Sequence, residues 1–172
     1  MSRAIVMNIR HAKKADEDAI WRIFQEVVSP GNTYVFSSEI SREEALSYWM
    51  GDATWMGDAT HCYVLEEAGE ILGTYIIKDN QPALGAHVAN ASFMVSSEAR
   101  GKGVGEAMGL SALRQAKELG YRAMQFNMVV STNAGAVRLW KKLGFKIVGT
   151  VPEVFRHREL GFVDAHIMHR FL

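Results

Sequence analysis

The stretch that decides the fold is residues 89–120, ANASFMVSSEARGKGVGEAMGLSALRQAKELG. It has the pattern of a strand, a glycine-rich turn and a helix. Ala91 to Val95 is a short apolar run that suits a buried strand. The alternate glycines in RGKGVG, residues 100–105, let the backbone bend tightly and approach another group closely. From about Val104 the pattern is helical, and Gly120 is placed to end the helix.

Four residues at helical spacing form an apolar stripe on this helix and predict the side that faces the core. A glycine turn that opens a helix presents backbone N–H groups and the positive end of the helix dipole to whatever binds there. The expected ligand is therefore an anionic group, and a phosphate fits best. The stripe consists of Met108, Ala112, Ala116 and Leu119.

The composition of the chain limits the classes of protein to which it can belong. The 172 residues suit one domain, 1–172, with a substantial core. Nineteen basic residues balance nineteen acidic ones, so we expect neither nucleic acid nor a membrane as a partner. The single cysteine, Cys62, excludes an internal disulfide, and no apolar run is long enough to span a membrane. The start of the chain does not resemble a signal peptide, so we expect a cytoplasmic protein.

The other elements interleave strands and helices without strict alternation. Asp16 is placed to cap a first helix, and Ser41 with Glu44 forms a capping box for a second, roughly Arg42 to Met50. This pattern predicts an α+β fold, with a mixed, mainly antiparallel sheet of about six to seven strands flanked by about four helices. The remaining expected elements are a hairpin of Cys62 to Glu66 and Ile71 to Lys78, strands at Ile5 to Arg10, Ala123 to Val130, Lys146 to Val151 and Val163 to Phe171, and a short helix capped by Asn133.

One hexapeptide occurs twice in succession. WMGDAT fills residues 49–54 and again residues 55–60. Two copies are too few for a solenoid. Two interpretations remain open, a local duplication that lengthens a loop and a loop that gates access of a substrate.

The glycine turn must be compared with other phosphate-binding patterns. A Walker loop, G-x-x-x-x-G-K-[ST], is absent. The dinucleotide fingerprint G-x-G-x-x-G lacks its third glycine, because Glu106 or Met108 occupies that position. The pattern that fits is R-x-x-G-x-G, formed by Arg100, Gly103 and Gly105 between a strand and a helix.

At these residues the chain resembles the GNAT superfamily of acyl-CoA-dependent N-acyltransferases, whose signature is [QR]-x-x-G-x-[GA]. Asn133 to Phe145 is similar to the family's N-x-x-A-x-x-L-Y-x-x-x-G-F segment, and Ile9-Arg10-x-Ala12 is typical of its start. Within the superfamily, the segment Tyr34 to Phe36 and the tail Gly161 to Asp164 resemble the phosphinothricin acetyltransferase-like amino-acid N-acyltransferases.

The resemblance implies a site for acetyl-CoA between the strand ending at Val95 and the strand Ala123 to Val130, which splay apart. The pantetheine arm pairs with the first strand, and the pyrophosphate sits on the amides of the glycine turn. No metal is expected, because His61, His166 and His169 lack a metal-ligand spacing. The implied cofactor-binding residues are Phe93, Met94, Val95, Arg100, Gly101, Lys102, Gly103, Val104, Gly105, Asn133 and Trp140.

The implied reaction is attack of a neutral amine on the thioester. A backbone N–H near Val95 is the oxyanion donor by resemblance. Relatives place a glutamate base on the strand before the turn, but this strand carries no carboxylate, so His87 is the nearest candidate base and Asn90 a residue that orients a water. His87 is alternatively a plain surface residue. Trp140 replaces a tyrosine that commonly protonates the thiolate; an indole cannot do so and packs against the pantetheine or the core.

For the acceptor, the resemblance points to Tyr34 and Phe36, with core packing as the alternative role. Arg156, His157 and Arg158 either receive a substrate carboxylate or form a solvated turn. We therefore expect transfer of an acetyl group from acetyl-CoA to a primary amine of a small molecule, such as an amino acid or analogue. A non-catalytic acyl-CoA-binding module and acetylation of a protein N-terminus or lysine are the alternatives. The resemblance also implies a possible homodimer.

Overall fold

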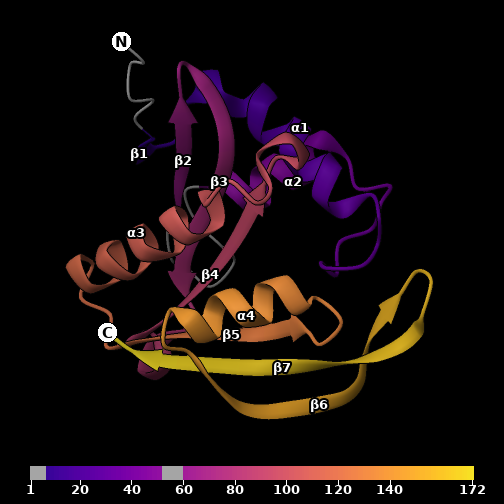
Figure 1. The fold of residues 1–172 in the computed structure, drawn as a ribbon. Helices are drawn as coiled ribbons and strands as arrows, with labels where there is room; N and C mark the ends of the chain where they lie inside the picture. The colour runs from indigo at the N-terminus through magenta and orange to yellow at the C-terminus, as the bar shows by residue number, and fades with distance from the viewer. Residues whose placement is uncertain (1–6, 52–59) are drawn as a thin grey trace.

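The computed structural model describes residues 7–51 and 60–172 (Figure 1). In this part of the chain seven strands form one sheet, and four α-helices flank it. The predicted mixed, mainly antiparallel α+β fold is confirmed. The sheet contains, in spatial order, β1 (Asn8–His11), β2 (His61–Glu67), β3 (Glu70–Asp79), β4 (Val88–Val95), β5 (Ala123–Val130), β7 (Gly161–Phe171) and β6 (Lys146–His157). The helices are α1 (Glu17–Val28), α2 (Arg42–Met50), α3 (Val104–Glu118) and α4 (Ala134–Lys142), with 3-10 turns η1 (Lys14–Asp16), η2 (Ala83–Gly85) and η3 (Ser97–Ala99).

The sheet opens in its middle, between β4 and β5. These neighbours are the only parallel pair in the described sheet, and they pair only at Val88 with Ala123 and Ala89 with Met124. Beyond these pairs the strands diverge, as Figure 1 shows: β4 rises away from the nearly horizontal β5. A break in register between Phe126 and Val129 bends β5 at this point. The expected parting of the two strands is present.

Each face of the sheet carries its own core. On β3, Thr74 and Ile76 face α1 and α2, whereas Tyr75 and Ile77 face α3, because successive side chains in a strand point to opposite faces. The first of these cores contains the largest fully buried side chain, Trp49 of α2.

Helix α3 begins at Val104, as predicted, and Met108, Ala112 and Ala116 are fully buried. Leu119 is a correction, because 42% of its surface is exposed. It lies after the last helical residue, where its backbone caps the helix and its side chain no longer follows the stripe. Gly120 then leaves the helix with a positive φ of 92°, a conformation that costs glycine little.

The ends of two other elements also differ from expectation. Strand β6 continues to His157, six residues beyond the predicted end at Val151, so Arg156 and His157 belong to a strand and not to a turn. Asp16 immediately precedes α1 but its carboxylate does not cap the helix, because it binds the guanidinium of Arg10 and the amide of Lys13. The capping box of Ser41 is confirmed.

Three observations complete the fold. Residues 52–59, which hold most of the WMGDAT repeat and all of its second copy except Thr60, lie outside the described residues, as does the start of the predicted first strand. No helix among the described residues is long and apolar enough to cross a membrane.

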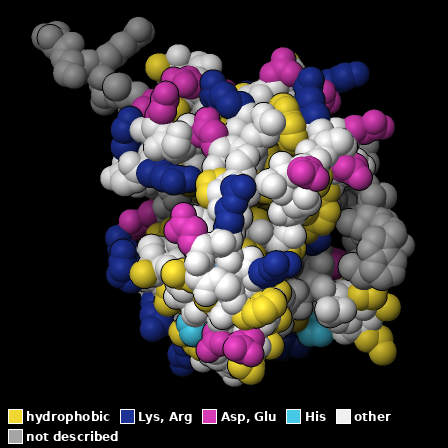
Figure 2. Space-filling model, turned by 90° about the vertical axis from the view of Figure 1, so that its right-hand side faces the viewer, with side chains coloured by type: hydrophobic (Ala, Val, Ile, Leu, Met, Phe, Trp, Pro, Cys, Tyr) yellow, Lys and Arg dark blue, Asp and Glu magenta, His cyan; other side chains and the backbone are white. Residues whose placement is uncertain are grey.

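Figure 2 shows the face that bears the α1–α2 segment and the β6–β7 hairpin, on which acidic and basic side chains are interspersed.

Candidate active site

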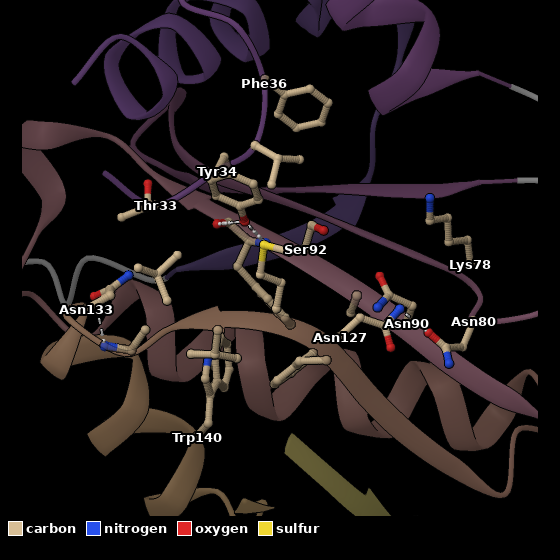
Figure 3. A pocket seen from close by; sticks show the side chains of 18 of the residues that line it. Thr33, Tyr34, Phe36, Lys78, Asn80, Asn90, Ser92, Asn127, Asn133 and Trp140 are labelled. Atoms are coloured by element: carbon tan, nitrogen blue, oxygen red, sulfur yellow. Dashed lines mark hydrogen bonds between the residues drawn. The ribbon is translucent and has the colours of Figure 1, made fainter. Parts of the chain in front are cut away.

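A pocket of about 390 Å³ occupies the space where β4 and β5 part (Figure 3). The segment between α1 and α2 covers one side of it with Tyr34 and Phe36. The diverging strands β4 and β5 form its floor, and Trp140 of α4 closes it on the far side of the sheet. The pocket therefore draws on elements that are distant in sequence and meet only because the sheet opens.

Tyr34 makes the principal contact across this pocket. Its hydroxyl accepts a hydrogen bond from the backbone N–H of Phe93 at 3.0 Å and donates one to the Phe93 carbonyl at 2.7 Å. Ser92 lies beside this hydroxyl in Figure 3. Burial raises the pKa of Tyr34 well above its ordinary value, so the phenol stays protonated. The residue predicted as an acceptor wall therefore also holds the backbone of β4.

Aromatic rings line the side of the parting that faces α4. The ring of Phe93 lies 4.7 Å from Trp140 between centroids, and Phe126 of β5 lies 4.8 Å from Trp140. Trp140 is 8% exposed and lines the pocket. It therefore packs in the core, which is one of the two roles expected for it, and also presents an apolar edge to the pocket; its contact with pantetheine stays a prediction.

Polar side chains gather at the end of the pocket where β4 and β5 are still paired. Asn90 donates to the Gln125 carbonyl at 3.0 Å and so joins the two strands just after their last backbone pair. Asn127 donates to the side chain of Asn80 at 2.6 Å. Lys78 lines this end as well, and its ammonium donates to the hydroxyl of Tyr48 at 2.9 Å. Figure 3 shows Lys78, Asn80, Asn90 and Asn127 together here.

One pocket hydroxyl has no partner. The side-chain oxygen of Thr33 is buried and makes no hydrogen bond to any described residue. A buried hydroxyl without a partner costs free energy, so such groups are normally bonded to protein, water or a ligand. The wall of the pocket therefore contains a polar atom whose hydrogen bonding is not satisfied by the described residues.

The glycine turn lies at the other end of β4. Gly101 and Gly103 have positive φ angles of 75° and 81°, and a β-carbon on either would meet nothing within 4 Å. Gly103 caps α3 without a side-chain cap, so among the described residues the first amides of the helix are available to an anion. Gly105 differs, because a β-carbon there would lie 3.3 Å from Leu139 of α4. Its absence of a side chain serves helix packing.

A glutamate supports the approach to this turn. Glu26 of α1 accepts a hydrogen bond from the Ser97 amide at 2.9 Å, which lowers the pKa of its carboxyl. Arg100 and Lys102 are exposed at the turn. Asn133 caps α4 by accepting from the Ala136 amide and also lines the pocket.

The remaining predicted residues lie as follows. Val95 is the last residue of β4, next to the glycine turn. Its backbone N–H and C=O point to the same edge of the strand as those of Phe93, since this direction repeats at every second residue. His87 is exposed before β4 and does not line the pocket; six residues, about 20 Å of strand, separate it from Phe93. Arg156, His157 and Arg158 line a separate hollow of about 310 Å³ beside the α1–α2 segment.

Sequence reasoning did not find the polar end of the pocket. Tyr48, Lys78, Asn80 and Asn127 line it but were not singled out. A weak signal was present, since Lys78 and Asn80 follow a buried apolar run and Asn127 interrupts another. The described residues hold no group of three or more metal-ligating side chains.

Comparison with known proteins identifies the family. The sequence model of the acetyltransferase (GNAT) family matches residues 19–145. The N-acetyltransferase aca1 of Schizosaccharomyces pombe is 36% identical over 151 residues, which cover 81% of this chain and 72% of the relative. An L-methionine sulfoximine/L-methionine sulfone acetyltransferase of Pseudomonas paraeruginosa is 30% identical over 148 residues, with 86% of this chain and 84% of the relative covered.

Solved structures agree with this assignment. A GCN5-related N-acetyltransferase from Kribbella flavida is 45% identical, with a TM-score of 0.90 over 96% of this chain and 98% of that one. The protein yncA from Salmonella typhimurium, solved with acetyl-CoA, is 25% identical, with a TM-score of 0.82 over 97% of this chain and 94% of that one. The chain described here therefore belongs to the acetyltransferase (GNAT) family and is an acetyl-CoA-dependent acyltransferase.

Proposed function

We propose that the protein transfers an acetyl group from acetyl-CoA to the primary amine of a small molecule, an amino acid or a close analogue. The observation that carries this proposal is the pocket at the parting of β4 and β5, which reaches Phe93 and Trp140 on one side and the polar group around Lys78 on the other. Its volume of about 390 Å³ suits a small acceptor beside an acyl group. The relative that acetylates methionine sulfoximine or methionine sulfone, as its name states, supports this class of acceptor.

The residues present fit acetyl-CoA. The open amides from Gly101 to Gly105 and the first turn of α3 would bind the pyrophosphate, with Arg100 and Lys102 adding charge. The backbone of β4 from Phe93 to Val95 would pair with the pantetheine arm, which enters from the turn. Thr33 offers its unpartnered hydroxyl to the same ligand or to the acceptor.

In the reaction, the amine nitrogen attacks the thioester carbon, the C–S bond breaks, and CoA leaves as a thiolate that takes up one proton while the new amide loses one. The N–H of Val95 or Phe93 would bind the oxyanion. The side-chain nitrogen of Asn90 donates to the Gln125 carbonyl. Its side-chain oxygen would accept a hydrogen bond from a water or from the ammonium of the acceptor. The exposed position of His87 argues against a role as base.

The test is an acceptor screen at fixed acetyl-CoA, read as release of free thiol, preceded by calorimetric titration with acetyl-CoA. We expect acetyl-CoA to bind at micromolar to low millimolar concentration and free amino acids to be acetylated faster than peptides. Turnover with peptides alone would replace the proposal by acetylation of protein N-termini or lysines. Absence of acetyl-CoA binding at millimolar concentration would overturn it.

A further inference from the structure

The ammonium of Lys78 lies at the polar end of the pocket and forms no ion pair with an acidic side chain among the described residues. Its Nζ donates to the Tyr48 hydroxyl at 2.9 Å and lies 4.5 Å from the centroid of the Tyr48 ring. Both contacts orient the ammonium, but neither neutralises it. Among the ion pairs found within residues 7–51 and 60–172, none involves Lys78.

The neighbouring residue Asp79 also lines the pocket, but its carboxylate is bonded to a group other than Lys78. Asp79 follows Lys78 in β3, and adjacent side chains of a strand point to opposite faces. The carboxylate of Asp79 accepts a hydrogen bond from the hydroxyl of Tyr121 at 2.6 Å, from the segment that follows α3. Lys78 instead shares the α1–α2 face with Asn90, its partner in the register of β3 and β4.

The amides around Lys78 leave donors free for the same ligand. Asn127 donates to the Asn80 oxygen, and Gln125 donates to the Asn127 oxygen. This chain of bonds fixes the Asn80 amide so that its nitrogen has no acceptor among the described residues. An ammonium and an amide nitrogen that line one end of a pocket are donors suited to a carboxylate.

The position of this end matches the geometry of an amino acid. Pantetheine entering from the glycine turn would bring the thioester to Phe93 and Ser92, since the strands close beyond Asn90. The register row of Lys78 and Asn90 lies two residues, about 7 Å, from the row of Ile76 and Ser92. The flexible side chain of Lys78 can cover part of that distance. An acceptor therefore has room for its amine at the thioester and its acid at Lys78.

We propose that Lys78 is the specificity-determining residue of the acceptor site: it binds a carboxylate carried by the acceptor and excludes amines whose second charge is positive. This inference rests on the proposed function and narrows it. The positive charge of Lys78 both attracts a carboxylate and repels a second ammonium. Removing this charge should therefore change both effects together.

The experiment compares Lys78→Met and Lys78→Arg with the wild-type protein, using three acceptors: L-methionine sulfone, its carboxamide, and the diamine putrescine. In Lys78→Met we expect KM for the amino acid to rise at least tenfold, KM for the carboxamide to change less than twofold, and putrescine to improve. Lys78→Arg keeps most of the preference for the acid. Lys117→Met, an exposed lysine on α3, is the matched control and should leave all three unchanged.

Equal losses for the acid and the carboxamide in Lys78→Met would overturn the inference, because they would indicate a structural role for Lys78. Equal use of acid, carboxamide and diamine by the wild type would also overturn it while leaving the proposed acetyl transfer intact. Binding of acetyl-CoA without turnover of any amine would instead overturn the proposed function. In that case the inference is tested alone by calorimetric titration of the CoA-saturated protein with L-methionine sulfone. We expect the wild type to bind the sulfone and Lys78→Met not to bind it; any other result would overturn the inference.

Discussion

The hydroxyl of Tyr34 bonds both backbone polar groups of a single residue, Phe93. These two groups face the parting of the sheet and are the ones that an additional strand on β4 would use. Tyr34 thus bonds the backbone groups of β4 with which, by family resemblance, the pantetheine arm is expected to pair. Because the Phe93 N–H donates to one acceptor at a time, an acyl-CoA that accepts from this N–H has to displace the Tyr34 hydroxyl from it. Occupation of the acyl-CoA site would then alter the wall of the acceptor pocket.

Replacing Tyr34 with Phe tests this competition. We expect Tyr34→Phe to bind acetyl-CoA more tightly than the wild type, because the Phe93 backbone is released, while the free energy of unfolding falls by about 1 kcal/mol. Calorimetric titration and urea denaturation measure the two quantities. Since burial keeps the Tyr34 phenol protonated, the ratio of the two affinities should not change between about pH 6 and pH 9. Tenfold weaker binding by the variant would show that Tyr34 supports the cosubstrate and does not compete with it.

Thr33 next to Tyr34 allows a test of ligand contact with little cost to the fold. Its buried hydroxyl has no partner among the described residues, so Thr33→Val breaks no hydrogen bond within that part of the protein. We expect thermal stability to stay the same or rise, because an unsatisfied polar group is removed. If a bound molecule uses the hydroxyl, either the Kd for acetyl-CoA or the KM for the acceptor should rise about three- to tenfold. A loss of stability of more than 1 kcal/mol would mean that the hydroxyl is satisfied in the free protein.

Local signals in the sequence predicted most of the fold. The capping box of Ser41, the asparagine cap at Asn133 and the glycine at 120 each act within a few residues, so the boundaries they predict match the structure. The parting of β4 and β5 was expected only through family resemblance. No local pattern reveals it, because it depends on how far two strands pair across thirty-five residues of chain.

The candidate site was harder to predict for the same reason. Tyr34 meets Phe93 across 59 residues, and Lys78 meets Tyr48 across 30 residues. Neither pair shares a motif, so only the folded arrangement brings them together. At Leu119 a local signal gave a wrong prediction. Its helical periodicity predicted a place in the core, but the helix ends one residue earlier and the side chain is exposed.

Gly103 provides a test of the phosphate site with a matched control. Gly103→Val adds side-chain bulk where the pyrophosphate is expected, and it also strains a backbone with a φ of 81°. Gly161→Val imposes similar strain at a φ of 76° at the first residue of β7, again with nothing within 4 Å. Both variants should lose about 1–2 kcal/mol of stability. Only Gly103→Val should weaken acetyl-CoA binding, by at least tenfold in titration. Equal affinities in the two variants would place the phosphate elsewhere.

Trp140 allows a test of whether the thiolate needs an acid. Trp140→Tyr and Trp140→Phe leave similar cavities beside Phe93 and Phe126 and differ only in a hydroxyl. We expect both to lose about 1–3 kcal/mol of stability. Their kcat values should agree within threefold, because a thiol with a reference pKa of about 8.5 is a good leaving group without help. A tenfold faster Trp140→Tyr would show that protonation of the thiolate limits the wild-type enzyme.

The carboxylate of Asp16 is the buried acidic group that ties β1 to α1. It is 6% exposed, binds Arg10 at 2.8 and 3.0 Å, and accepts the amide of Lys13 at 2.7 Å. The hydrogen bond from Arg10 is the main reason that the pKa of Asp16 lies below its ordinary value. A group whose pKa is lower in the folded state stabilises the fold above its unfolded pKa, near 3.9, and this contribution is lost as pH falls through the folded value.

Asp16→Asn should therefore lower the free energy of unfolding at pH 7 by about 1–3 kcal/mol, because Arg10 loses one of its two carboxylate partners and keeps only Glu66. The difference from the wild type should begin to shrink as the pH falls below about 4, since the carboxyl of the unfolded wild-type chain then takes up a proton, and it should vanish once the folded carboxyl is protonated as well. Urea denaturation at pH 7, 5 and 3.5 measures this trend. The control is Asp18→Asn, whose side chain is 90% exposed beside Arg42 and should matter little at any pH. A loss for Asp16→Asn that stays constant down to pH 3 would mean that hydrogen bonding, and not charge, carries the effect.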